Sequence, residues 1–511
     1  MFLHKFQKSI VSTNFSTAIS IGIPLLIFLA LHVYRPFILG LYHDDWFLFT
    51  LPIFLDENKI FENLYAGFKD RPIFLYAVYS VVKTWDGQPE TLTLISSGFV
   101  GISGFLLYKF LGRITALAGF NSLAASAGTA FWIVIPWGMG YSLWPIGTMT
   151  LLGPIFFLGA AILSIDYITR GGNWRVLAVF TTLGLSFFSY QSSYFSYIPL
   201  ITLAVILGPG TKEFFNRAII LFVASSVIQA TSILYAKSVT IKTLSISFKL
   251  LFGNVIYSLP VAMNKPFEQY SFVFWLSFIG VIICIALFMK GINRVSQRRM
   301  VFAICACCAG IAIGTVPFSL AGYMVQGVGV FSRTTVFSNI WLAVLITISI
   351  MMPFSQGLAK AKWLVASVAT LILVCFLASS YQINNWAQSW ARQNEILETF
   401  PVNSLYQVAD NSIVILNEPS TIRGVEVFAA SWDITRALYS RIGLEDLSHF
   451  ESRPRIIPFT KKMSWDGKET FKTNENISST ANEVWLYSPS SGIFEKITTP
   501  GLIELHINRS N

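Results

Sequence analysis

The chain consists largely of apolar stretches, most of them close to the length that a helix needs to cross a bilayer. Such a helix takes about 20 apolar residues. Hydrophobic residues make up 54% of the 511 residues and charged residues 12%, whereas a soluble chain carries about 25% charged residues. We therefore expect an all-α polytopic membrane protein with about eleven transmembrane helices. The expected spans are residues 17–38, 92–111, 114–135, 147–168, 175–191, 193–209, 217–236, 270–289, 300–320, 336–353 and 363–381.

The basic residues predict which side of the membrane each loop faces. Cytoplasmic loops that are short carry an excess of Lys and Arg. With the N-terminus in the cytoplasm, these loops hold Lys109, Arg113, Arg170, Arg175, Lys212, Arg217, Lys290, Arg294, Arg298, Arg299, Lys360 and Lys362. The outer loop 237–269 is also basic, but it is longer and its charge density is lower. The net charge of +10 follows this topology and does not indicate a nucleic-acid partner.

The composition changes to that of a soluble chain at about residue 385. We therefore divide the chain into a transmembrane domain, 1–381, and a C-terminal domain, 382–511. An odd number of spans places this second domain on the extracytoplasmic side. Its patterns predict a small α/β module, with helices at 384–399 and 433–442, a strand at 412–416 and a hairpin over 483–497. The module is expected to dock an acceptor or to cap the helix bundle.

Acidic residues gather in the first outer loop, residues 41–91. Before residue 382 the acidic residues are Asp44, Asp45, Asp56, Glu57, Glu62, Asp70, Asp86, Glu90, Asp166, Glu213 and Glu268, and all but the last three lie in this loop. The loop is long, and its segments 46–66 and 71–85 have the pattern of amphipathic helices at the membrane interface. We expect any chemistry to occur here.

The tightest cluster in this loop is His43-Asp44-Asp45-Trp46, where the first span leaves the membrane. Two adjacent carboxylates repel each other, so at least one is expected to have a raised proton affinity. Such a group suits a general base that deprotonates a sugar hydroxyl. Two alternatives remain open: the acids are solvated loop charges, or His43, Asp44 and Asp45 bind a metal. Three consecutive residues rarely converge on one ion.

Other polar residues of the outer face could join the same site. Arg71, in Lys69-Asp70-Arg71-Pro72, offers forked donors to a phosphate but could equally extend to lipid headgroups. Arg333 is the one charged residue between Arg299 and Lys360 and lies at the outer end of a span, as a functional residue or as an anchor. Tyr190-Gln191 could bind sugar hydroxyls or join helices. For the tryptophans and tyrosine Trp46, Trp85, Trp137, Tyr141 and Trp144, an interfacial aromatic belt is favoured over a sugar platform.

Together, these features resemble the GT-C membrane glycosyltransferases, and most of all the bacterial GtrII-type glucosyltransferases that convert O-antigen serotypes. The resemblance rests on Asp44-Asp45, Arg71-Pro72, Tyr190-Gln191 and Arg333, in this order and on one side of the membrane. It covers about residues 1–381. It implies an enzyme of the bacterial inner membrane that moves a sugar, glucose first, from a polyprenyl-phosphate carrier to a hydroxyl of a surface glycan, with inversion at the anomeric carbon.

The resemblance also implies roles for individual residues. Asp44 and Asp45 would be the catalytic pair, with Asp44 as the base. Arg71, Arg333 and Lys69 would hold the donor phosphate. The remaining substrate-binding residues would be His43, Trp46, Tyr76, Tyr190 and Gln191. Donors that are lipid monophosphates imply no metal and no cofactor.

Two other functions compete with this one. A transporter or flippase for lipid-linked sugars would show ionisable residues in the middle of spans or paired repeats with broken helices, and the sequence shows few of the first and no repeat. An O-antigen polymerase or ligase also works at the outer leaflet, but such enzymes place their important loop late in the chain. The acidic loop after the first span favours the transferase.

Overall fold

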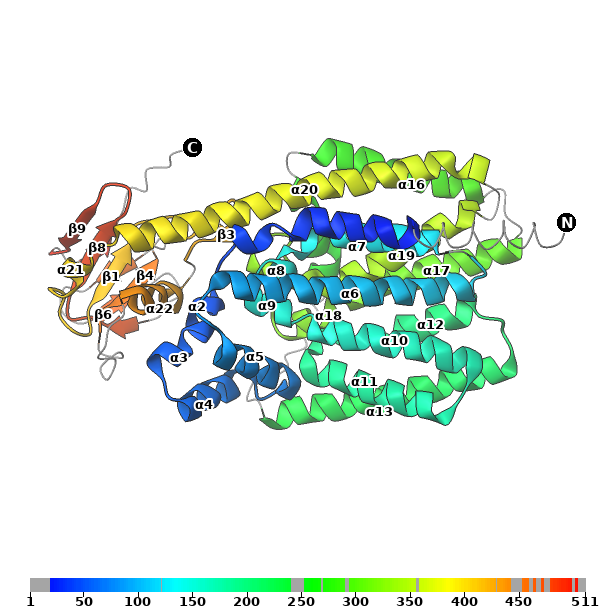
Figure 1. The fold of residues 1–511 in the computed structure, drawn as a ribbon, viewed down its shortest axis with the longest axis horizontal. Helices are drawn as coiled ribbons and strands as arrows, with labels where there is room; N and C mark the ends of the chain where they lie inside the picture. The colour runs from blue at the N-terminus through cyan, green and yellow to red at the C-terminus, as the bar shows by residue number, and fades with distance from the viewer. Residues whose placement is uncertain are drawn as a thin grey trace.

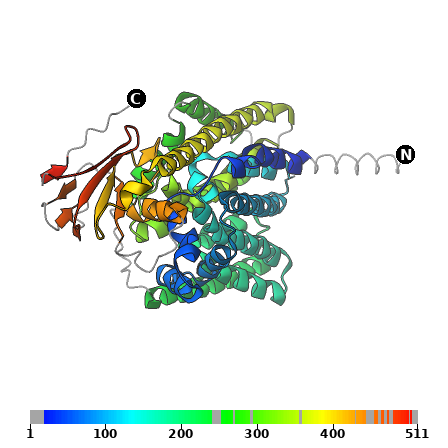
Figure 2. The ribbon, with the colours of Figure 1, turned by 60° about the vertical axis from the view of Figure 1, so that its left-hand side comes forward.

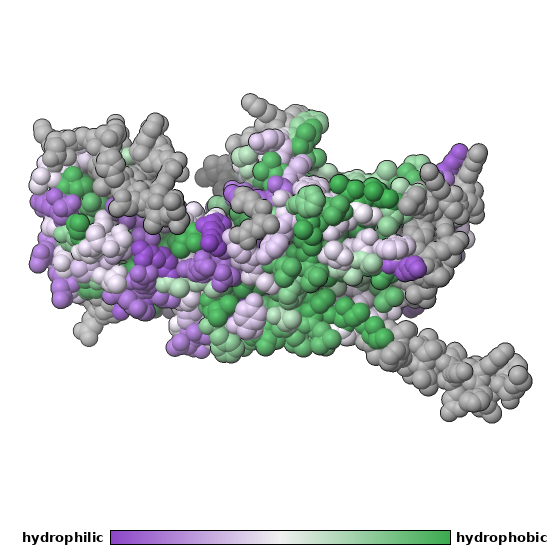
Figure 3. Space-filling view, turned by 90° about the horizontal axis from the view of Figure 1, so that it is seen from above, coloured by the Kyte–Doolittle hydropathy of each residue, from purple (hydrophilic) through white to green (hydrophobic). Residues whose placement is uncertain are grey.

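A computed structural model describes residues 19–120, 122–239, 252–267, 270–289, 294–354, 358–428, 430–442, 453–458, 463–465, 470–472, 478–498 and 501–503. Long helices run side by side along the molecule, and a small sheet-containing region lies at one end (Figure 1). Within the described residues, 7 helices are long and apolar enough to cross a membrane, or up to 9 if each of two bent pairs is one span. On the face drawn in Figure 3, hydrophobic residues predominate over the helical part, and hydrophilic residues are more frequent toward the sheet end. The chain is a multi-pass membrane protein.

Each of the eleven predicted segments overlaps a helix, but not every helix is long enough to span. The first span is Ile19–Phe37, and its end is the short helix η1 (Arg35–Phe37). Two predicted spans are short helices, α11 with 17 residues and α12 with 11, joined by η3 (Gln191–Ser193). The two short helices are α11 (Asn173–Ser189) and α12 (Tyr197–Leu207), and the longer ones are α6 (Pro89–Leu117), α10 (Leu152–Arg170), α13 (Lys212–Val239), α16 (Ser271–Met289), α17 (Arg294–Ile313), α19 (Val336–Phe354) and α20 (Leu358–Thr399).

The third predicted span, 114–135, is wrong in its boundaries. Helix α6 continues to Leu117, and α7 occupies only Leu123–Val134. The chain then bends by 54° into η2 (Pro136–Gly138) and α8 (Met139–Ser142), followed by α9 (Pro145–Met149). Proline cannot continue a helix without losing a hydrogen bond, which explains the breaks at Pro136 and Pro145.

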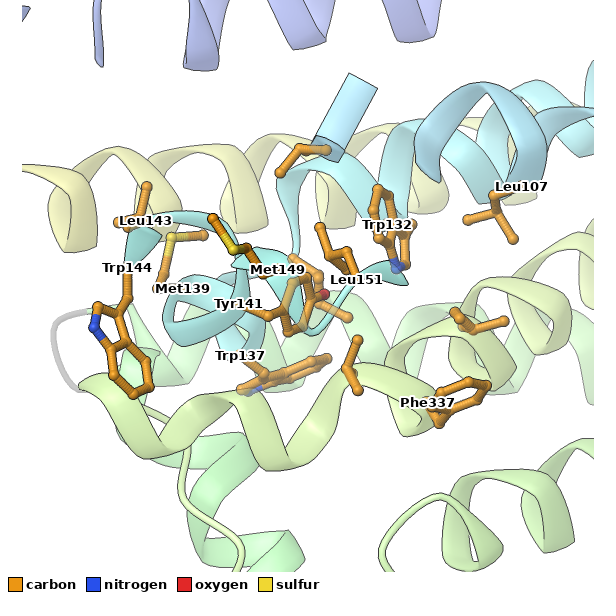
Figure 4. Close-up of a cluster of buried hydrophobic side chains, with 14 of the residues drawn as sticks. Leu107, Trp132, Trp137, Met139, Tyr141, Leu143, Trp144, Met149, Leu151 and Phe337 are labelled. Atoms are coloured by element: carbon orange, nitrogen blue, oxygen red, sulfur yellow. The ribbon is translucent and has the colours of Figure 1, made fainter. Parts of the chain in front are cut away.

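The broken segment after α7 forms the centre of the core. Figure 4 shows Trp137, Tyr141 and Trp144 among its buried side chains, and each is about 2% exposed. The predicted aromatic belt is therefore wrong for these three residues, because they pack inside the bundle instead of at its lipid boundary. Gly140 permits this packing: a Cβ at this position would lie 2.9 Å from the backbone nitrogen of Arg333. Helix α8 therefore lies close against η6 (Val330–Thr335).

The first outer loop folds into four short helices: α2 (Asp44–Phe49), α3 (Leu51–Phe54), α4 (Glu57–Phe68) and α5 (Pro72–Thr84). The single helix predicted over 46–66 is wrong, whereas α5 matches the predicted segment 71–85. The break before α4 has a local cause: Leu55 is extended, and the Asp56 carboxylate accepts the Lys59 N–H at 3.0 Å as an N-cap. Asp56 thus serves local structure.

Helix α20 continues without interruption through residue 382, where the two domains were expected to divide. Its 42 residues correspond to about 63 Å of helix, roughly twice the hydrocarbon thickness. The extra length projects beyond the bundle and carries the sheet region at its end (Figures 1 and 2). The predicted amphipathic helix at 384–399 is the last part of α20.

The C-terminal region contains a four-stranded sheet in the order β4-β1-β8-β9, with β1 parallel to both neighbours and β9 antiparallel. Strand β1 lies in the middle because its residues, IVIL, are buried on both faces. The predicted strand, helix and hairpin of this region are confirmed as β1, α22 and β8–β9. The elements are α21 (Val402–Leu405), β1 (Ile413–Leu416), β2 (Thr421–Ile422), β3 (Val425–Glu426), α22 (Ser431–Ile442), β4 (Arg455–Pro458), β5 (Met463–Trp465), β6 (Thr470–Lys472), β7 (Ser478–Thr480), β8 (Val484–Ser488), β9 (Ile493–Lys496) and β10 (Gly501–Ile503).

Candidate active site

A cavity of about 520 Å³ opens where the first outer loop meets the ends of the membrane helices. This volume is in the range of pockets that hold small ligands. Segments that are distant in sequence form its walls: α2 and the start of α5, α9, η3, the end of α13, α18 (Val316–Leu320) and η6. Its polar lining residues include Asp44, Asp70, Arg71, Thr150, Tyr190, Gln191, Lys237, Tyr323, Arg333 and Thr334.

Five of the ten site residues predicted from the sequence line the cavity. Asp44, Arg71, Tyr190, Gln191 and Arg333 all line it. They come from four separate parts of the chain, and only Tyr190 and Gln191 are neighbours in sequence. The other five predicted site residues do not line the cavity, and are His43, Asp45, Trp46, Lys69 and Tyr76.

Asp44 is one of two carboxylates that line the cavity, together with Asp70, and its side chain is 41% exposed. Its Oδ1 forms an ion pair with His43 Nδ1 at 2.9 Å and accepts a hydrogen bond from Trp432 Nε1 at 3.3 Å. Within the described part of the chain, Oδ2 has no hydrogen-bond partner. Asp44 therefore has one oxygen that is held by the protein and one that is available to a substrate.

His43 lies behind Asp44 and not in the cavity wall. Its backbone has φ 48° and ψ −126°, a strained conformation for a residue with a side chain. Burial acts to lower the pKa of the imidazole, whereas Asp44 raises it through its hydrogen bond and charge. The carboxylates of Asp433 and Glu426 raise it further, and the pKa of His43 reaches about 9. His43 is therefore a cation at neutral pH.

The same partners act on Asp44 in the opposite direction. Burial acts to raise the pKa of the Asp44 carboxyl. The hydrogen bond and positive charge of His43, followed by the charge of Arg333, lower it more, so this pKa lies below that of an ordinary aspartate. Asp44 is thus ionised at neutral pH, which is the state a general base requires.

Asp45 has a structural environment that differs from that of its neighbour. Its side chain has no exposed surface, and its two oxygens accept the backbone N–H groups of Tyr42 and Ile146, both at 2.9 Å. Burial raises the pKa of Asp45 well above its usual value, although these hydrogen bonds oppose the shift. The raised proton affinity predicted for one of the two carboxylates therefore falls on the one that a substrate cannot reach. Asp45 fastens the strained turn at His43 to the start of α9.

Arg71 lies among three aromatic rings at the start of α5. Its guanidinium carbon is 5.2 Å from the ring centre of Phe68, 5.3 Å from that of Phe74 and 5.6 Å from that of Tyr190. Such cation–π contacts orient a guanidinium without neutralising it. Arg71 also contacts Asp70, with Nε 3.3 Å from Oδ1.

Gln191 connects this arginine to the far side of the cavity. Its Nε2 donates to the backbone oxygen of Asp70 at 3.2 Å and to Oδ2 of the same residue at 3.1 Å. Gln191 therefore joins η3 to the start of α5, and Asp70 lies between Gln191 and Arg71. The tripeptide Lys69-Asp70-Arg71 was noticed in the sequence, but Asp70 itself was missed as a site residue.

Arg333 faces the cavity from η6, on the same side as Asp44. Its guanidinium carbon is 4.8 Å from the ring centre of Trp144 and 5.1 Å from that of Phe331. One nitrogen, Nη1, reaches the backbone oxygen of Val330 at 3.5 Å. Among the described residues, no carboxylate lies within ion-pair distance of Arg333, so most of its donors are available to an anion.

The predicted residues outside the cavity have other partners. Trp46 is buried, stacks on Trp390 with ring centres 5.9 Å apart, and donates Nε1–H to Gln393 at 2.7 Å. Tyr76 is 58% exposed on the outer face of α5. Lys69 contributes its backbone oxygen, which accepts from the Tyr235 hydroxyl at 3.0 Å.

The outer loop 237–269, which is also basic, begins beside the cavity. Lys237 lines the cavity at the end of α13. Lys242 and Lys249 lie outside the described residues.

The C-terminal region supplies contacts that the sequence did not predict. Trp432, at the start of α22, reaches Asp44, and Glu426 in β3 accepts the backbone N–H of Val330 at 3.2 Å. Burial is the main cause that raises the pKa of Glu426 above its usual value. Helix α22 packs against α2 (Figure 1). No local pattern around residues 426–432 indicates these contacts. Asp44 lies 388 residues before Trp432 in the sequence, and Val330 lies 96 residues before Glu426.

The metal site considered for His43, Asp44 and Asp45 is not formed, because Asp45 faces the backbone of Tyr42 and Ile146. Instead, His43, Asp44 and Asp433 have ligand atoms within 4.8 Å of one another. Asp433 already accepts the backbone N–H of Ala430 at 3.1 Å as part of the α22 cap. That the implied sugar transfer needs no metal stays a prediction.

Comparison with known proteins adds a remote structural likeness. No protein-family model matches the sequence, and no curated protein matches it. Among solved structures, the chain is similar to ArnT from Cupriavidus metallidurans, crystallised in the apo state. The TM-score is 0.41 with 10% sequence identity, and the match covers 88% of this chain and 90% of that one. A function must therefore be argued from the cavity itself.

Proposed function

We propose that this chain is a membrane glycosyltransferase of the GT-C type, which moves a sugar from a polyprenyl-phosphate carrier to a hydroxyl of a surface glycan. The observation that carries the proposal is one cavity that holds an ionised carboxylate, Asp44, and two arginines, Arg71 and Arg333. A sugar transfer from a lipid phosphate needs both functions: a base for the acceptor and cations for the leaving group. Glucose is the first sugar to test and O-antigen the first acceptor.

The reaction is a single displacement at the anomeric carbon. The acceptor hydroxyl gives its proton to Oδ2 of Asp44 as its oxygen bonds to the anomeric carbon. The bond between that carbon and the phosphate oxygen breaks, and its electron pair stays on the polyprenyl phosphate. Arg333 and Arg71 stabilise the charge that accumulates there, because guanidinium groups match phosphate oxygens. Attack and departure on opposite sides of the carbon invert its configuration.

The lining of the cavity also suits a lipid-linked donor. Apolar side chains lie beside the arginines, and they are Leu48, Phe68, Phe74, Ile233, Pro317, Phe318 and Leu320. A charged and an apolar surface in one cavity favour a substrate whose phosphate is attached to a hydrocarbon chain. A carrier already embedded in lipid removes the need for a nucleotide sugar, which is not available outside the cytoplasmic membrane.

The proposed reaction fixes an orientation in the bacterial inner membrane. The cavity opens toward the periplasm, with the N-terminus in the cytoplasm and the C-terminal domain in the periplasm. The distribution of basic residues supports this orientation. We expect no metal requirement, since the arginines supply the positive charge. Transfer by the purified protein should therefore be unchanged by EDTA, and a loss that Mg²⁺, Mn²⁺ or Zn²⁺ restores would contradict the metal-independent reaction.

The test compares the masses of the host's lipid-linked and surface glycans in strains that differ only in this protein. Wild type should add one hexose to each repeat unit, and Asp44→Asn should not. Asp166→Asn is the matched control, because Asp166 pairs with Arg113 at 3.1 Å in a salt bridge away from the cavity lining. Equal membrane amounts of all variants must be verified. Identical masses in all strains, with the carrier-linked donor present, would refute transfer to that glycan, and movement of the lipid-linked sugar across the membrane would then be measured.

A further inference from the structure

Trp432 is the aromatic side chain that touches the proposed base from outside the cavity. Its Nε1–H donates to Oδ1 of Asp44 at 3.3 Å, but Trp432 is not among the residues that line the cavity. The residue remains 49% exposed although the polar edge of its ring is hydrogen-bonded. An indole that is half-exposed and held by one edge presents an apolar face to solvent.

The ring is held in place by its surroundings. His43 meets it edge to face, with ring centres 6.4 Å apart and an interplanar angle of 79°. One turn further along α22, the Arg436 guanidinium lies 5.2 Å from the ring centre of Phe47 and 4.7 Å from that of Phe54. These contacts fix α22 on the first outer loop, so the indole has little freedom beside Asp44. A fixed aromatic surface binds a ligand with a small loss of entropy.

The position of Trp432 assigns it to one of the two substrates. The leaving phosphate is expected on the cavity side of Asp44, where Arg71 and Arg333 lie. In an inverting displacement, the acceptor approaches from the side opposite the leaving group. Trp432 stands outside that cavity and next to the proposed base, which is where the ring that carries the attacking hydroxyl must lie.

We propose that the exposed indole face of Trp432 is the platform on which a pyranose ring of the acceptor glycan stacks during transfer. The inference rests on the proposed function. The C–H groups on one face of a pyranose form an apolar surface that carries partial positive charge, and the indole face is its electrostatic complement. The C-terminal domain thus contributes an acceptor subsite, and its contact with Asp44 fixes the distance between stacked sugar and base.

The test separates stacking from a merely structural role. Kinetics are measured with the purified full-length protein, a polyprenyl-phosphate glucose donor, and the glycan that gains a hexose in the mass comparison. Trp432→Ala should raise the KM for this acceptor about tenfold, whereas the KM for the donor stays within about twofold. Trp432→Phe keeps a ring but loses the N–H, and it should recover most of the acceptor affinity. Tyr406→Ala is the control, because Tyr406 is a more exposed aromatic residue, 61%, of the same domain.

The outcomes are distinguishable from those of the proposed function. If wild type transfers and Trp432→Ala leaves the acceptor KM unchanged, the platform is refuted. If Trp432→Phe is as impaired as Trp432→Ala and both lose kcat instead of acceptor affinity, Trp432 only positions Asp44, and the platform is also refuted. If wild type transfers no sugar to any glycan, the proposed function has failed, whatever the variants do.

Discussion

The two walls of the cavity are built in different ways. The Asp44 wall consists of Asp44, Trp144 and Arg333, and His43 and Trp432 support Asp44 from outside the cavity. These residues come from four separate parts of the chain, which a hydrogen bond, ring contacts and charge hold together. The Arg71 wall consists of Phe68, Asp70, Arg71, Phe74 and Tyr190, mostly from one segment and held by aromatic packing. The contacts of the Asp44 wall hold its charged side chains in fixed positions. The aromatic rings of the Arg71 wall form a surface that a bound substrate can pack against. We infer that chemistry depends on the Asp44 wall and donor binding on both.

The largest effect expected on the Asp44 wall is the loss of the base. Asp44→Asn should lower kcat about 10³-fold with little change in the KM for the donor, since general bases contribute 10²–10⁴-fold. Asp45→Asn should retain kcat within about tenfold but unfold at a lower temperature, because a buried N–H of Tyr42 or Ile146 loses its acceptor at a cost of about 1–3 kcal/mol. Transfer kinetics and thermal unfolding in detergent measure both. If Asp45→Asn is folded but less active than Asp44→Asn, Asp45 and not Asp44 is the base.

The next effect compares the arginines of the two walls. Arg333→Gln should raise the KM for the donor about 30-fold and Arg71→Gln about fivefold, since a charge-assisted hydrogen bond contributes about 1.5–3 kcal/mol. The difference is expected because Asp70 already offsets part of the charge of Arg71, whereas Arg333 has no acidic partner in the described part of the chain. Arg113→Gln, away from the cavity, is the control. Equal effects of both cavity variants would remove the distinction between the walls.

A smaller effect concerns pH and the Asp44 wall alone. His43 has a pKa of about 9 in the folded protein, above the unfolded value of about 6.5. Its stabilisation is therefore fully present below about pH 6.5 and is lost as the pH rises through about 9, at most about 3 kcal/mol in total. The melting temperature of wild type should fall more between pH 7 and about 10 than that of His43→Gln. Parallel curves for the two proteins would show that His43 is not a cation in the folded state.

The smallest effect is expected just outside the Arg71 wall. Tyr76 is on the same helix as this wall but is 58% exposed and does not line the cavity. Tyr76→Ala should change kcat and both KM values by less than about twofold, as exposed substitutions usually do. A rise in the donor KM comparable to that of Arg71→Gln would extend the donor site along the outer face of α5.

The sequence predicted much of the fold because apolar stretches and charge patterns are local signals. All eleven expected segments contain helix, and the strand, helix and hairpin of the C-terminal region are in their expected places. The breaks around Pro136 and Pro145 were missed, although two prolines and several glycines in residues 136–147 indicated them. The unbroken α20 was missed because its composition changes along its length while its helical character does not.

The cavity was predictable in part for the same reason. Asp44, Arg71, Tyr190, Gln191 and Arg333 lie in or beside segments that the charge pattern assigns to one side of the membrane, and the structure brings them together in one cavity. The sequence could not predict that Asp44 faces the cavity and Asp45 the core. Successive residues of a helix point about 100° apart, and the sequence does not say which of the two faces inward. Trp432 could not be found, since its contact with Asp44 depends on how α22 packs on α2.

The most direct test of the central claim measures donor binding and turnover in the same proteins. Purified wild type, Asp44→Asn and Arg333→Gln are titrated with polyprenyl-phosphate glucose, and the release of polyprenyl phosphate is followed after the acceptor is added. The account predicts that Asp44→Asn binds the donor as wild type does but does not release the carrier, whereas Arg333→Gln binds it weakly. Release by Asp44→Asn at the wild-type rate would contradict Asp44 as the base, and unchanged donor binding by Arg333→Gln would contradict its role in holding the phosphate.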